Sequence, residues 1–181
     1  FPAWMVGKNP KLKIIQTTHT AELSDGFGRK VKNLIIQDEF KEVFPDVKLA
    51  EDSKASGRFN TNKGGEYFAA GVGGAITGLG ADLLIIDDPH SEQDALSDKK
   101  MEDAYEWYTS GPRQRLQPGG SIVVVMTRWS VKDLTGKLLA KQTGESADQW
   151  DVVEFPAILN DKPMWPEFWN LPELLSVKAS I

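Results

Sequence analysis

The sequence predicts an α/β fold, a three-layer sandwich in which helices cover both faces of a mainly parallel sheet. Two segments, 82–87 and 121–127, carry continuous apolar runs, as strands do when both faces of a parallel sheet are covered. Segments with helical periodicity, around 21–40 and 97–110, alternate with these strands. This alternation favours an α/β architecture with a largely parallel sheet.

The first half of the chain adds a strand, a long helix and a hairpin. Lys11–Thr18 has a β-rich centre and predicts the first strand. The helix at 21–40 has one apolar face at helical spacing, formed by Leu23, Phe27, Val31, Leu34 and Ile35. After a polar loop at 45–56, the glycine-rich segment 57–82 predicts a hairpin with a strand at 67–70, because glycines permit tight turns.

The second half of the chain completes the alternation. Pro118–Gly120 predicts a turn between the helix and the second apolar strand. Ser130 is a candidate N-cap for the next helix, with Asp133 three residues later as in a capping box. A final strand is expected at 151–155, and the chain from Pro156 onward is expected to be irregular.

Composition places the chain among ordinary globular proteins. Its 181 residues fit one domain, and 40% of them are hydrophobic while 26% are charged. The net charge of -5 argues against an overall polyanion-binding surface but leaves room for a local basic groove. There is no cysteine, so a disulfide framework and a thiolate metal site are excluded. No apolar run approaches 18 residues, and we expect no membrane span.

Two adjacent carboxylates follow the first apolar strand in the stretch "LLIIDDPH". Asp87 and Asp88 can form a Walker B motif, in which the first acid orders Mg²⁺ and the second orients or deprotonates an attacking water. The alternative is a pair of solvated loop carboxylates. In open α/β sheets ligands bind beyond the carboxyl ends of the strands, which is where both acids are expected.

The second apolar strand ends in "VVVMTRWS". The Thr127 hydroxyl can bind a phosphate or an attacking water, and Arg128 can bind a phosphate or pair with an acid. The alternative is an exposed strand end. Two polar strand tips separated by one helix are a stronger signal than either tip alone.

Three other features have weaker functional signals. His19 and His90 could contribute to a metal site, but polar loop residues near a cleft are the preferred interpretation. The run "GVGGAITGLG" lacks the Lys-Ser/Thr pair of a phosphate loop and precedes a strand, so hairpin turns are preferred. Arg113 and Arg115 are expected at a solvated helix end, with a phosphate- or DNA-facing role as the minority interpretation.

Taken together, "LLIIDDPH", "RLQPGG", "VVVMTRWS" and "DLTG" resemble the ATPase domain of tailed-phage terminase large subunits, the motors that package DNA into proheads. The resemblance covers roughly Arg58 to Leu139. It implies a P-loop NTPase fold of the RecA-like, additional-strand type, with ATP and Mg²⁺ as cofactors. It also implies that Asp87 holds Mg²⁺, that Asp88 is the catalytic carboxylate, and that Thr127 and Arg128 couple hydrolysis to movement.

The chain departs from that family in two ways. The second acid is commonly Glu in terminases, whereas here it is Asp88, one methylene shorter. A phosphate loop with its Lys and Ser/Thr is absent from the sequence, and it is expected upstream of Phe1 together with the first strand of the fold. On this interpretation 1–156 is an ATPase core truncated at its N-terminus, and 157–181 begins a linker toward a nuclease domain expected beyond Ile181.

The resemblance also implies partners. They are double-stranded DNA, the portal protein, the small terminase subunit and further copies in a ring, in the host cytoplasm and not in the mature virion. This fragment alone is expected to hydrolyse ATP negligibly. The trans- or cis-acting arginine of such a motor would be one of Arg58, Arg113, Arg115 and Arg128. Two alternatives remain: a helicase-like ATPase that translocates nucleic acid, and a non-catalytic interaction module.

Overall fold

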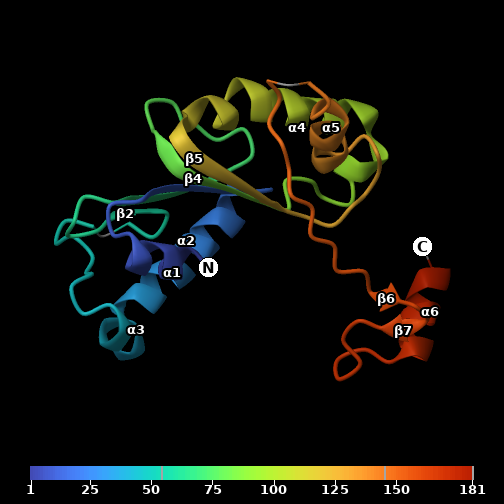
Figure 1. Ribbon diagram of the computed structural model, residues 1–181, viewed down its shortest axis with the longest axis horizontal. Helices are drawn as coiled ribbons and strands as arrows, with labels where there is room; N and C mark the ends of the chain where they lie inside the picture. Colours follow the sequence, from blue (N-terminus) through green and yellow to red (C-terminus); the bar gives the residue numbers. More distant parts are fainter. Residues whose placement is uncertain (54, 145, 181) are drawn as a thin grey trace. The chain divides into compact units, whose positions relative to one another are not determined.

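The computed structural model describes residues 1–53, 55–144 and 146–180. Contacts divide the chain into two compact units, Phe1–Lys141 and Gln142–Ile181. The α/β fold lies in the first unit (Figure 1). The division by contacts therefore falls earlier in the chain than the boundary expected between residues 156 and 157.

A five-stranded sheet forms the centre of the first unit. Its strands are β1 (Lys13–Thr18), β2 (Arg58–Asn60), β3 (Glu66–Gly71), β4 (Ala81–Asp87) and β5 (Leu116–Val125), in the order β2-β3-β1-β4-β5. β1 is parallel to β3 and β4, and β4 is parallel to β5, while β2 runs antiparallel to β3. The predicted, mainly parallel sheet is confirmed.

Helices lie on both faces of this sheet, in an arrangement compatible with a three-layer sandwich (Figure 1). On one face are α1 (Pro2–Lys8) and α2 (Ala21–Ile36), with α3 (Asp38–Val43) following. On the other are α4 (Asp98–Ser110) and α5 (Leu134–Lys141). Short 3-10 helices, η1 (Asp94–Leu96) and η2 (Pro112–Arg115), flank α4.

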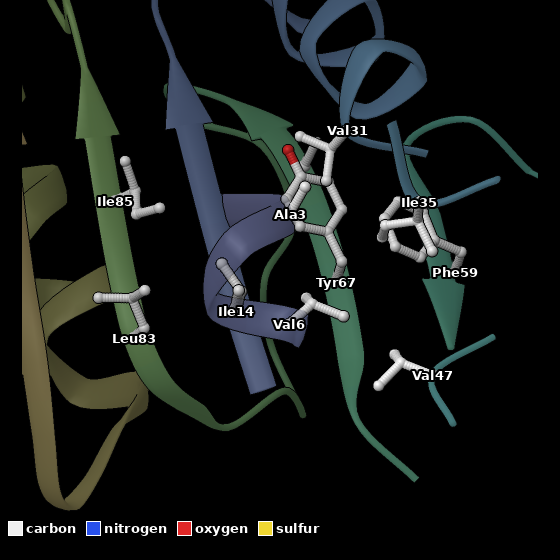
Figure 2. Close-up of a cluster of buried hydrophobic side chains, with 11 residues drawn as sticks. Ala3, Val6, Ile14, Val31, Ile35, Val47, Phe59, Tyr67, Leu83 and Ile85 are labelled. Carbon is white, nitrogen blue, oxygen red and sulfur yellow. The ribbon is translucent and has the colours of Figure 1, made fainter. Parts of the chain in front are cut away.

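The core between the sheet and the α1–α2 layer joins residues far apart in the sequence. Figure 2 shows Val31 and Ile35 of α2 beside Tyr67 of β3, with Ile14 of β1 and Leu83 of β4 on the same face of the sheet. All of these side chains are buried. Burial of apolar surface stabilises the folded state by about 25 cal/mol per Å². This cluster therefore determines which strand residues face the α1–α2 layer.

The buried stripe of α2 differs from the apolar face that the sequence predicts. Val31 and Ile35 are buried as expected, but Leu23 is 52% exposed and Leu34 is 46% exposed. Small residues take their place, since Ser24 and Gly28 are buried. These small side chains let α2 approach the neighbouring backbone closely. A search for hydrophobic residues alone does not identify such a stripe.

The glycine-rich connection also differs in part from the prediction. β2 and β3 do form an antiparallel hairpin. The glycines that follow do not make a second one, because β3 and β4 run parallel on opposite sides of β1. Residues 72–80 are instead a crossover, with φ of 80° at Gly73 and 81° at Gly78. These left-handed conformations suit glycine.

β5 is less buried than its sequence predicts. It forms an edge of the sheet in the part of the chain that the structure describes, and Val125 at its end is 54% exposed. The predicted turn at Pro118–Gly120 lies within β5 as an irregularity, because Ala81 pairs with Leu116 while Leu83 pairs with Ser121. The extra residues bulge out of the ladder.

The second unit corrects two predictions. Residues 151–155 form no strand, and the apolar residues Val153 and Phe155 are 74% and 82% exposed. After them come a small hairpin, β6 (Ile158–Leu159) with β7 (Lys162–Pro163), and the helix α6 (Leu171–Ala179), so the segment is not wholly irregular. A capping box of Asn170 and Glu173 starts α6.

Candidate functional site

The carboxyl ends of the parallel strands form one row. Thr18 at the end of β1 is in register with Gly71 of β3 and with Asp87 of β4, and Asp87 is in register with Val125 of β5. The segments that leave these strands therefore start from one edge of the sheet. The predicted site residues Asp87, Asp88, Thr127 and Arg128 all lie on this edge or just beyond it.

Asp87 ends β4 with its backbone in the ladder. Burial raises the pKa of its carboxyl, and the charge of Asp88 raises it further. A carboxylate that is costly to ionise in this way gains from a nearby cation, since an opposite charge offsets both effects. The position fits the predicted Mg²⁺ ligand.

Asp88 leaves the strand in a left-handed conformation, with φ of 42°. Its N–H donates to the carbonyl oxygen of Val125 at 2.8 Å, and its Oδ1 accepts from the N–H of Thr127 at 3.1 Å. Asp is among the residues that tolerate this conformation. The unusual backbone turns the second acid toward the tip of the neighbouring strand, where the Thr127 amide fixes it.

Arg128 pairs with an acid. Its Nε donates to Oδ2 of Asp133 at 3.0 Å and its Nη2 donates to the carbonyl oxygen of Ser130 at 3.2 Å. Of the two uses considered for this side chain, the structure shows the ion pair. This ion pair therefore links the end of β5 to the start of α5.

Asp133 organises the segment between β5 and α5. The predicted N-cap at Ser130 is wrong, because α5 begins at Leu134 and Asp133 is the residue that caps it, while the Ser130 hydroxyl accepts from the N–H of Lys132. Oδ2 of Asp133 also accepts from the N–H groups of Trp129 and Ser130, and its Oδ1 accepts from the N–H of Gly136 at 2.7 Å. Burial raises the pKa of this fully buried carboxyl, but the hydrogen bonds lower it more, so the net pKa is below its usual range. The sequence signal was present, because Asp133 directly precedes the apolar periodicity of α5.

Both histidines lie by one cavity, as the preferred interpretation held. His19 and His90 line a cavity of about 300 Å³ together with Asp94 of η1 and Trp107 of α4. Nε2 of His90 accepts from the N–H of Leu134 at 3.0 Å. Burial lowers the pKa of His90, which therefore stays neutral at pH 7. Sequence reasoning did not single out Asp94 or Trp107.

Within the described residues, no three His, Cys, Asp or Glu side chains are grouped so that they could hold a metal ion. A Mg²⁺ site beside nucleotide phosphates needs fewer protein ligands, because the ion keeps several waters. The other candidate arginines lie elsewhere in the fold: Arg58 pairs with Glu66 at 2.7 Å, and Arg113 and Arg115 lie in η2.

No model of a known protein family matches this chain, and no curated protein matches it. No helix in the described part of the chain is long and apolar enough to cross a membrane. The geometry of the strand tips and the motif resemblance are therefore the grounds for a function.

Proposed function

We propose that this chain is the Mg²⁺- and water-handling part of an ATPase motor of the terminase large-subunit kind, which moves double-stranded DNA. The observation that carries the proposal is the pair of acids at the carboxyl end of a buried parallel strand. Asp87 has a raised pKa, and Asp88 is held by the N–H of Thr127 on the adjacent strand. Isolated loop carboxylates would need neither feature.

The two acids have separate roles in this proposal. Asp87 holds Mg²⁺ through a carboxylate oxygen, and the ion, when bound, neutralises charge on the phosphates. Asp88 accepts a proton from the attacking water, which is general-base catalysis. The lysine-bearing phosphate loop is absent from the sequence of this chain, so the proposal requires that it be supplied from outside residues 1–181.

A coupling path follows from the same contacts. Asp88 binds the Thr127 amide, Arg128 binds Asp133, and Asp133 holds the first turn of α5. A change at Asp88 during hydrolysis would pull on Thr127 and reach α5 through this chain of bonds. The nucleic acid would be held through its backbone phosphates, which carry no sequence information.

Metal binding by the 181-residue chain tests the proposal. Titration with Mn²⁺, a paramagnetic substitute for Mg²⁺, should broaden the amide resonances of Asp87, Asp88 and Thr127 first. Asp87→Asn should abolish this local broadening, whereas Asp98→Asn, at an exposed acid on α4, should not. Broadening that persists in Asp87→Asn, or that is equal at all surface acids, would contradict the metal role of Asp87.

A further inference from the structure

The cavity beside the two histidines lies where the connections of the sheet change direction. From β1 the chain leads through α2 to β3 on one side, and from β4 it leads through α4 to β5 on the other. α2 and α4 lie on opposite faces (Figure 1). Such a switch point, between β1 and β4, opens a crevice at the carboxyl ends of the strands and is where α/β sheets bind ligands. His19 follows β1 and His90 follows β4, and both line the cavity.

His90 gives the cavity a hydrogen-bond donor. The imidazole is only 4% exposed, and its Nε2 accepts the N–H of Leu134. The proton of the neutral ring is therefore on Nδ1. Among the described residues no hydrogen bond from Nδ1 is found, and Nδ1 is not one of the buried side-chain atoms that lack a partner, so it is accessible to a molecule in the cavity. A ligand atom with a lone pair would satisfy it.

Asp94 gives the cavity an acceptor. Its Oδ2 accepts from the N–H of Ser91 at 3.1 Å and lies 3.5 Å from Nδ1 of His19. Burial raises the pKa of Asp94, but the bonds from Ser91 and the charges of His19 and Lys100 lower it more, so it remains ionised. Its other oxygen can accept from a ligand N–H, in a charge-assisted bond.

The walls favour a flat ring. The half-buried indole of Trp107 lines the cavity, with Val72, Pro89 and Ala104 as further apolar lining. The volume, about 300 Å³, is at the lower end for small-molecule sites. Aromatic side chains stack on the faces of nucleobases and so favour their binding.

We infer that this cavity binds an amino-bearing nucleobase (adenine, cytosine or guanine), with its ring nitrogen toward His90, its amino group toward Asp94 and its face against Trp107. These three bases present a ring-nitrogen acceptor next to an amino donor, which complements a donor on His90 and an acceptor on Asp94. Thymine has no amino group. The inference does not depend on the proposed ATPase, because it requires neither phosphate nor Mg²⁺.

Titration of the ¹⁵N-labelled 181-residue chain with adenosine, without Mg²⁺, tests the inference. We expect saturable shifts of the Trp107 indole N–H and the His90 ring nitrogens, and at least about tenfold weaker binding of thymidine. Asp94→Asn should weaken adenosine binding about tenfold, while Glu92→Gln, at a neighbouring exposed acid, should not. Trp107→Ala should also weaken adenosine binding about tenfold. Trp107→Phe and the distant Trp165→Ala should keep an affinity for adenosine within about threefold of wild type.

A single-stranded oligo(dA) distinguishes the two sources of the base. If the oligomer binds more tightly than adenosine and its binding weakens with salt, the ligand is an unstacked DNA base. If its affinity per base equals that of adenosine, the ligand is a mononucleotide. Absence of saturable shifts with both ligands would overturn the inference. So would equal binding of adenosine and thymidine, or wild-type affinity in Asp94→Asn.

Discussion

Replacing Asp133 by alanine removes the acceptor that holds the tip of β5 against α5. The backbone N–H groups of Trp129, Ser130 and Gly136 lose their partner, and Arg128 loses its ion pair. A lost helix cap costs about 0.5–2 kcal/mol, and a hydrogen bond to a charged group about 1.5–3 kcal/mol. Arg128 is 44% exposed and regains water, so we expect a total of about 2–4 kcal/mol.

Urea denaturation at pH 7 measures this loss as a lower unfolding midpoint at unchanged slope. Asp98→Ala is the control, because that acid is 78% exposed and pairs with Lys132 on the surface; it should cost less than about 1 kcal/mol. A loss below about 1 kcal/mol in Asp133→Ala would refute the structural role assigned to this carboxylate.

The same pair of proteins gives a pH test of Asp133. The pKa of Asp133 is lower in the folded than in the unfolded protein, so its carboxylate contributes its full share of stability above the unfolded pKa of about 4. This share of stability is lost as the pH falls through the folded pKa. The difference in stability between wild type and Asp133→Ala should therefore be constant from pH 7 to about 5 and shrink in acid. If the difference in stability between the two proteins stayed constant to a pH at which Asp133 is fully protonated, that would contradict its lowered pKa.

Three further predictions concern other parts of the fold. Asp87→Asn should stabilise the metal-free chain by up to about 1 kcal/mol, seen as a higher Tm, because it removes a carboxylate whose pKa is raised; a lower Tm would contradict this. Gly28→Ala should cost about 1–3 kcal/mol in urea, since its Cβ would lie 2.5 Å from the carbonyl oxygen of Ser56. Gly26→Ala on the same helix meets nothing within 4 Å and should gain about 0.5–1 kcal/mol; equal effects would refute the close approach. Tyr67 should stay protonated while folded, because burial first and the charge of Asp87 second raise its pKa. Stability should therefore fall above pH 10, and phenolate absorbance should rise only with unfolding.

The architecture was predictable because it depends on patterns that are local in sequence. The apolar run before Asp87 became the buried strand β4, and Ser97 caps α4 as the start of the predicted helix. The hairpin assignment of the second glycine cluster failed because glycines permit a turn without specifying its direction. Whether a chain reverses or crosses over is decided by strand pairing far away in the sequence.

The place of the candidate residues in the fold could be predicted from the sequence, but the hydrogen bonds and ion pairs between them could not. Hydrophobic runs ending in polar residues placed Asp87, Asp88 and Thr127 at one edge, because parallel strands end together. Nothing in the sequence linked Arg128 to Asp133 in preference to a phosphate. The cavity could not be predicted either, since Asp94 and Trp107 reach it from elements whose packing is a tertiary property.

Asp87 and Asp88 are proposed to form an acid pair for Mg²⁺-dependent ATP hydrolysis. The rate of hydrolysis by a protein that contains this chain together with a phosphate loop tests this pair. We predict that Asp87→Asn abolishes Mg²⁺-dependent turnover. We also predict that Asp88→Asn retains nucleotide binding while turnover falls by about 10²-fold or more. Turnover near wild type in Asp88→Asn, with nucleotide binding intact, would contradict the catalytic role of Asp88.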